Sequence, residues 1–135
     1  MYNVGIIDET GHCISGALAS LDNGYNIKFV CDFDPKITQQ YIFLSNVTLV
    51  ISKFKLANYL LSNPNSIQLI FLSATKLVPT TYLEMLNLIN FQGKILCAST
   101  FDMPTYPLIN IGHNIHSFDF STIASQLESI MKNVK

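Results

Sequence analysis

Short apolar runs alternate with segments of helical periodicity along the whole chain, and this alternation restricts the fold more than any other feature. The runs occupy residues 4–7, 26–33, 47–51, 67–72 and 94–98. Short unbroken runs of this kind are typical of strands that are buried on both faces of a parallel sheet. Between them, apolar residues recur at spacings of three and four positions, which is the period of a helix. The alternation predicts a parallel sheet with helices on both faces.

The segments with helical spacing predict five helices, of which the last carries the clearest apolar stripe. A further β-like run at residues 108–111 is either a sixth strand or part of an ordered loop. No repeat, linker or shift in composition divides the chain. We therefore expect residues 1–135 to form a single α/β domain, a doubly wound parallel sheet of five or six strands with flavodoxin-like or receiver-like topology. The predicted helices span residues 14–21, 35–44, 54–61, 80–89 and 120–134.

The composition argues against several classes of function. The chain carries 8 lysines, no arginine and 9 acidic residues, so its formal net charge is −1. Nucleic-acid binding normally needs a basic stripe that displaces counterions from phosphates, and none is present. No segment approaches the ~20 continuous apolar residues of a membrane span, and the start lacks the pattern of a secretory signal. Cys13, Cys31 and Cys97 lack metal-type spacing and fit reduced thiols in a cytoplasmic protein.

Polar residues stand near the ends of several predicted strands. In a doubly wound sheet the carboxyl ends of the strands form the working edge. At or near that edge the sequence places five candidate site residues, which are Asp8, Glu9, Ser52, Ser73 and Cys97.

These five residues stand at the four motif positions of a known family, and two of the four positions match. The chain resembles the receiver domains of bacterial response regulators over roughly residues 2–100. Asp8-Glu9 matches the family's acidic pair, and Ser73 followed by alanine matches its switch position. Ser52 stands where the family has its phosphorylated aspartate, and Cys97 where it has a lysine. The resemblance therefore implies a degenerate receiver, because the phosphoryl acceptor and the cation that holds the product are both replaced.

The replaced residues imply a module without catalysis. Phosphoryl transfer to a carboxylate needs that carboxylate as nucleophile, with Mg²⁺ to neutralise the developing charge. Asp8 and Glu9 alone would bind Mg²⁺ weakly, so we expect no catalytic residue and no cofactor. The resemblance implies a phosphorylation-independent regulatory domain of a two-component signalling or transcription regulator. On this reading Asp8→Ala should barely alter stability.

Such a domain would act by forming a homodimer or by docking to another regulatory protein. Receiver-like domains often dimerise through the face formed by the fourth and fifth helices and the fifth strand. By resemblance, the interface here would include Tyr82, Met85, Ile89, Ser121, Ser125, Glu128 and Lys132.

The residues also leave other interpretations open. Asp8 or Glu9 could be a carboxylate held near the positive end of the first helix rather than a metal ligand. The alternative function is a small-molecule sensor or enzyme, with a pocket lined by Thr10, Ser73, Ser99 and Thr100. Asp32 and Asp34 invite comparison with the ribose-binding acid of dinucleotide folds. However, the first turn lacks the glycine pattern G-x-G-x-x-G, and its two carboxylates would repel a pyrophosphate.

Overall fold

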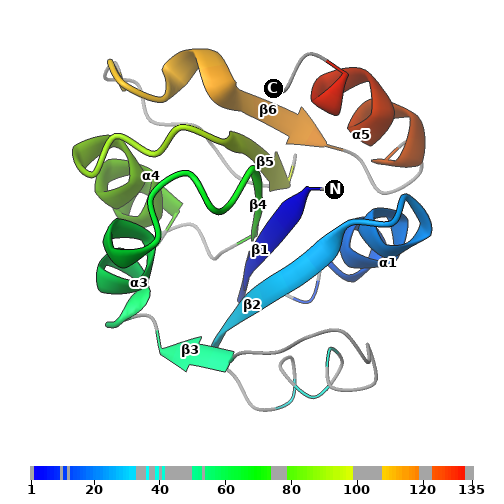
Figure 1. The fold of residues 1–135 in the computed structure, drawn as a ribbon, viewed down its shortest axis with the longest axis horizontal. Helices are drawn as coiled ribbons and strands as arrows, with labels where there is room; N and C mark the ends of the chain where they lie inside the picture. The colour runs from blue at the N-terminus through cyan, green and yellow to red at the C-terminus, as the bar shows by residue number, and fades with distance from the viewer. Residues whose placement is uncertain are drawn as a thin grey trace.

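The protein is an alternating sequence of strands and helices (Figure 1). The computed structural model describes residues 2–9, 11, 13–32, 36, 39, 41, 50–52, 54–73, 79–98, 108–118 and 123–132. In chain order the elements are β1 (Asn3–Asp8), α1 (Ile14–Asp22), β2 (Asn26–Asp32), β3 (Val50–Ser52), α3 (Leu56–Ser62), β4 (Leu69–Ser73), α4 (Pro79–Leu88), β5 (Lys94–Ala98), the short 3-10 helix η1 (Gly112–Asn114), β6 (Ile115–Phe118) and α5 (Ile123–Met131).

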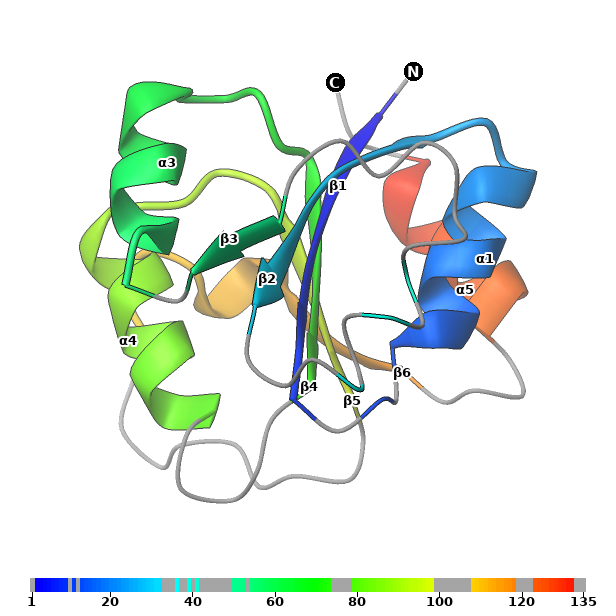
Figure 2. The ribbon, with the colours of Figure 1, turned by 90° about the horizontal axis from the view of Figure 1, so that it is seen from below.

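The strands form one parallel sheet of six strands, in the order β3-β2-β1-β4-β5-β6. Figure 2 shows α1 and α5 on one face of the sheet and α3 and α4 on the other. Parallel neighbours need long crossover connections, which explains why helices separate the strands along the chain. The predicted doubly wound α/β fold is confirmed.

The strand order differs from the order that the receiver resemblance implied. In flavodoxin-like sheets the order is 2-1-3-4-5, so β1 lies between β2 and β3. Here β2 lies between β1 and β3, and β1 has β4 as its other neighbour. Hydrophobic patterning could not distinguish the two orders, because both bury the same strands between the same kinds of helices.

The sixth strand lies later in the chain than the β-like run at residues 108–111. Ile115 pairs with Ile95 at the start of the β5–β6 ladder. The earlier run is instead a turn that is tied to α4. The backbone N–H of Asn110 donates to Asn87 Oδ1 at 2.8 Å, and the Asn110 side chain donates to the Asn87 carbonyl at 2.9 Å.

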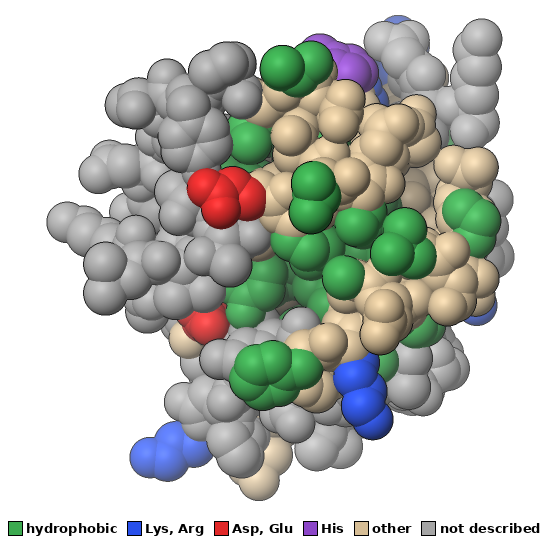
Figure 3. All heavy atoms as spheres, turned by 90° about the vertical axis from the view of Figure 1, so that its left-hand side faces the viewer, with side chains coloured by type: hydrophobic (Ala, Val, Ile, Leu, Met, Phe, Trp, Pro, Cys, Tyr) green, Lys and Arg blue, Asp and Glu red, His purple; other side chains and the backbone are tan. Residues whose placement is uncertain are grey.

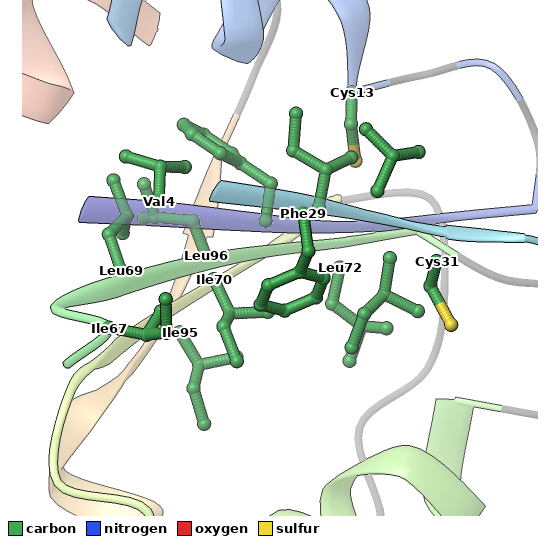
Figure 4. Packing of buried hydrophobic residues seen from close by; sticks show 14 of the residues in the cluster. Val4, Cys13, Phe29, Cys31, Ile67, Leu69, Ile70, Leu72, Ile95 and Leu96 are labelled. Carbon is green, nitrogen blue, oxygen red and sulfur yellow. The ribbon is translucent and has the colours of Figure 1, made fainter. Parts of the chain in front are cut away.

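The core has two layers, one on each face of the sheet. Figure 4 shows Val4 and Cys13 on one side of the sheet and Phe29 and Cys31 on the other. The ring of Phe29 is fully buried and meets Tyr59 of α3 edge-on, with ring centroids 5.4 Å apart. Successive side chains of a strand point to opposite faces, so each strand contributes to both layers. This double burial is why the strands read as continuous apolar runs.

Hydrophobic side chains gather on the face formed by α3 and α4 (Figure 3). Leu61 of α3 and Leu88 of α4 are both exposed. A pocket of about 220 Å³ lies beside them, lined in part by Leu60, Ile89 and Phe91. It lies where α3 leads into β4 and α4 leads into β5, at the amino ends of these strands.

Within the described part of the chain, no helix is long and apolar enough to cross a bilayer.

Candidate functional site

The strand order creates a switch point beside β1. The chain builds β2 and β3 on one side of β1 and then places β4 on the other. In open α/β sheets, ligands bind in the crevice outside the carboxyl ends of the strands at such a point. Asp8 ends β1 opposite Ser73, which ends β4, and the backbone N–H of Glu9 donates to the Ser73 carbonyl at 2.8 Å. This junction is the candidate site.

Asp8 is the central side chain of the junction and is only 2% exposed. Its carboxylate accepts hydrogen bonds from the backbone N–H of Gly11 at 2.8 Å and of Cys13 at 3.1 Å. The hydroxyl of Tyr41, which is also buried, donates to the same carboxylate. Cys13 directly precedes α1, so the carboxylate lies at the positive end of that helix. This arrangement matches the interpretation of Asp8 as a carboxylate held by the first helix.

The groups around Asp8 are held in their neutral forms. Burial, together with the nearby Cys13 and Asp8, raises the pKa of Tyr41 well above its usual value, so the phenol keeps the proton that it donates. Burial and then the charge of Asp8 raise the pKa of the Cys13 thiol. Burial also raises the pKa of Cys97 to about 12. A nucleophilic cysteine needs its thiolate, so neither thiol is suited to covalent catalysis at neutral pH.

The turn before α1 and the start of that helix contain two of the three glycines of a known pattern, which the sequence reasoning missed. Gly11-x-Cys13-x-x-Gly16 has the spacing of the dinucleotide fingerprint G-x-G-x-x-G, with cysteine at the second position. The first glycine of the fingerprint makes a tight turn, and Gly11 has a φ of 80°. The third allows a helix to pack closely on a strand, and a Cβ at Gly16 would lie 2.5 Å from Phe71 Cε1. The pattern begins three residues after Asp8, so a search for glycine immediately after the strand overlooks it.

Gly16→Ala tests whether this close approach matters. Phe71 is fully buried, so its ring cannot move away without disturbing the core. Alanine gains up to about 1 kcal/mol in helix propensity, but overpacking costs about 1–3 kcal/mol. We expect a net loss of about 1 kcal/mol in the free energy of unfolding, measured by urea denaturation. Gly112→Ala is the control, because a Cβ there meets no atom within 4 Å. Equal stability of the two variants would contradict the packing role.

The structure brings three of the five candidate residues together. Asp8, Glu9 and Ser73 meet at the junction of β1 and β4. Ser52 ends β3, and the whole of β2 lies between it and β1. Its hydroxyl accepts the backbone N–H of Phe54 at 3.1 Å, which stabilises the turn into α3. Cys97 lies within β5, buried among its neighbours. The four positions of a receiver site are therefore not assembled as one group.

The described residues contain no cluster that could hold a metal ion. No group of three or more His, Cys, Asp or Glu side chains comes together among them. His113 is in η1 and is exposed, whereas His116 is in β6. Weak Mg²⁺ binding by Asp8 and Glu9 stays a prediction. Four other candidate residues lie outside the described part of the chain, namely Thr10, Asp34, Ser99 and Thr100.

The predicted interface assumed that the fifth strand lies at the edge of the sheet, and here β5 has a further neighbour. Strand β6 covers the edge of β5 that the interface needed, and α4 and α5 lie on opposite faces of the sheet (Figure 2). Tyr82 is buried, and burial followed by the charge of Glu9 raises its pKa. Dimerisation stays a prediction. Of the other interface residues, Met85 and Ile89 are half-buried, Ser125, Glu128 and Lys132 are exposed, and Ser121 lies outside the described residues.

Solved structures of two dehydrogenases share the fold of this chain. The WlbA (WbpB) dehydrogenase from Thermus thermophilus, in complex with NAD and alpha-ketoglutarate, matches 99% of this chain and 46% of its own, with a TM-score of 0.64 and 8% identity. The prephenate dehydrogenase from A. aeolicus, in complex with hydroxyphenyl propionate and NAD+, matches 87% of this chain and 41% of its own, with a TM-score of 0.60 and 18% identity. No protein-family model and no curated protein matches the chain.

At these identities the likeness shows the fold alone. The chain spans less than half the length of each of these neighbours. The order β3-β2-β1-β4-β5-β6 is also the strand order of the dinucleotide-binding, or Rossmann, fold. The sequence predicted a doubly wound sheet and the structure has one. The strand order further identifies which of the doubly wound topologies it is.

These findings correct three expectations from the sequence. The predictions of a non-catalytic receiver-like module, of no enzymatic function and of no cofactor are wrong, because the structural neighbours are dehydrogenases that contain NAD. The findings favour the alternative, a small-molecule-binding sensor or enzyme. The physical reason for the error is that an acidic pair after the first strand occurs in more than one doubly wound topology, and the pair was interpreted without the strand order.

The residues at the switch point fit only part of a dinucleotide. Gly11 and Gly16 have the conformation and the packing that the fingerprint requires. Asp32 ends β2, about 20 residues beyond the turn, where such folds carry their ribose-binding acid. The pyrophosphate does not fit in the same way, because the Asp8 carboxylate already accepts the N–H groups of Gly11 and Cys13. The N–H groups at the start of α1 are therefore not available to the pyrophosphate of NAD in its usual place.

Proposed function

We propose that this chain is a small-molecule-binding domain of an enzyme and that its ligand contains a ribonucleoside. The observation that carries the proposal is the strand order, which puts a topological switch point between β1 and β4, the place where open α/β sheets bind ligands outside the carboxyl ends of their strands. The dehydrogenase neighbours support the proposal by analogy of fold. The residues that support it directly are Gly11, Gly16 and Asp32, which stand at the positions that hold the turn, the helix and the ribose in nucleotide-binding sheets.

The ligand would lie with its sugar over the end of β2. Asp32 is the last residue of that strand and is in register with Ser52 of β3. A carboxylate at this position accepts hydrogen bonds from ribose hydroxyls in dinucleotide folds. We assign Asp32 the role of recognising the ribose. We also place the protein in the cytoplasm, a proposal supported by three buried cysteines that form no disulfide.

Binding of adenosine and 2′-deoxyadenosine tests this proposal. Isothermal titration of the wild-type protein should detect adenosine. Loss of a hydrogen bond to a charged group costs about 1.5–3 kcal/mol, so 2′-deoxyadenosine should bind about 10- to 100-fold more weakly. In Asp32→Ala the two ligands should bind equally, because the residue that distinguishes them is gone.

An exposed carboxylate provides the control. Asp22, at the end of α1, is distant in the fold from the carboxyl edge, so Asp22→Ala should keep the preference for adenosine. No heat of binding and no shift in melting temperature with millimolar adenosine, NAD or NADH would contradict the proposed function.

A further inference from the structure

The N–H groups at the start of α1 are already occupied by a carboxylate of the same chain. Gly11 and Cys13 each donate a backbone N–H to a different oxygen of Asp8, at 2.8 and 3.1 Å. Tyr41 adds its hydroxyl to one of these oxygens. All four residues belong to the turn or pack on it, and Asp8, Cys13 and Tyr41 are buried. The positive end of this helix favours an anion, and the carboxylate of Asp8 is that anion.

In dinucleotide-binding folds the corresponding N–H groups point at the pyrophosphate. Two features of this chain oppose a phosphate there. The carboxylate of Asp8 takes the hydrogen bonds, and its negative charge repels a second anion. Cys13 replaces the glycine that allows the backbone to approach the pyrophosphate, and its side chain is fully buried at that point.

We propose that Asp8 takes the place of a ligand phosphate, so that the switch point beside β1 accepts a nucleoside or another phosphate-free ligand and excludes a pyrophosphate at this position. The choice of a nucleoside rests on the proposed function. The replacement of the phosphate by Asp8 does not, because it follows from the hydrogen bonds alone. The two parts can therefore be tested separately.

The replacement is tested by rescue with an anion. Asp8→Gly empties the space and frees the N–H groups, whereas Asp8→Asn removes the charge but keeps the side chain in place. Melting temperatures are measured with sodium pyrophosphate and with sodium chloride of the same ionic strength, without divalent cations. Pyrophosphate at tenfold excess over its Kd should raise the melting temperature of Asp8→Gly by about 3 °C or more. The wild type and Asp8→Asn should not respond.

Several results would overturn the replacement. One is a wild-type protein that pyrophosphate stabilises as strongly as the glycine variant. Another is an Asp8→Gly protein that folds but does not respond. If Asp8→Gly does not fold in chloride, it is refolded from urea in pyrophosphate, and recovery of the native circular dichroism is expected. Failure to recover in either salt counts against the proposal.

The ligand class is tested by titrating adenosine and ADP-ribose, which differ in the pyrophosphate and its second sugar. The wild type should bind adenosine at least tenfold more tightly than ADP-ribose, and Asp8→Gly should reverse this order. A wild type that prefers ADP-ribose would overturn the inference and leave the proposed function standing. If neither ligand binds the wild type or Asp8→Gly, the proposed function fails. The melting temperatures measured in pyrophosphate then still decide the role of Asp8.

Discussion

Asp8→Ala should lower the free energy of unfolding by about 3–5 kcal/mol, because it leaves several buried donors without their acceptor. The carboxylate accepts the N–H groups of Gly11 and Cys13 and the hydroxyl of Tyr41. Each buried donor left unsatisfied costs about 1–3 kcal/mol, and water entering the space recovers part of that sum. Urea denaturation followed by circular dichroism measures the loss. The result would replace the earlier expectation that this substitution barely alters stability.

The control for this prediction is Asp22→Ala, which removes an exposed carboxylate at the other end of α1. Surface substitutions of this kind usually stay within about 0.5 kcal/mol. Tyr41→Phe should lower the free energy of unfolding by a smaller amount than Asp8→Ala. In a protein that already carries Asp8→Ala it should cost less than it does in the wild type, because both substitutions remove the same hydrogen bond. A loss below about 1 kcal/mol in Asp8→Ala would mean that the carboxylate does not organise the turn.

Gly5→Ala should also be strongly destabilising, by about 3 kcal/mol, which is at the upper end of the usual cost of overpacking. A Cβ on Gly5 would lie 2.1 Å from the Cε2 and Cζ atoms of Phe29, its partner in the β1–β2 ladder. The Phe29 ring is fully buried and packs against Tyr59, so it has no free space to enter. Thermal and urea unfolding of the variant measure the effect.

A compensating substitution distinguishes this steric cause from any other effect of losing a glycine. Phe29→Leu removes ring atoms that a new Cβ would strike. The double variant with Gly5→Ala should therefore be more stable than the sum of the two single losses predicts. Additive losses would show that the Gly5–Phe29 contact is not what makes the first substitution costly.

Several features of the site could be predicted from residues that are close in sequence. The polar ends of the first and fourth strands were recognised, and Asp8, Glu9 and Ser73 do meet. The glycine pattern was missed because its second position is a cysteine and because it begins beyond Asp8. The burial of Asp8 was also beyond the sequence, since it depends on Tyr41, which lies 33 positions away.

The pairing of two segments depended on tertiary contacts that the sequence left open or the receiver resemblance misplaced. The run at residues 108–111 has good β-propensity. However, Asn110 is hydrogen-bonded to Asn87 of α4, and the strand that pairs with β5 begins only at Ile115. By resemblance, Ser52 occupied the acceptor position of a receiver site, yet β2 lies between its strand and β1. β-propensity describes how well a segment fits a pleated surface and does not identify its neighbour.

By itself, the sequence determined the class of the fold, because apolar runs and helical stripes are local patterns that report which faces are buried. It determined that the carboxyl edge of the sheet would be polar, since Asp8, Asp32 and Ser73 follow or end the apolar runs. Only the tertiary structure decided the order of the strands, and with it the switch point between β1 and β4. It alone also selected Asp8 as the carboxylate at the start of α1 and brought Tyr41, 33 positions away, to its side. Both depend on contacts between segments far apart in the chain, whose energies no local pattern records.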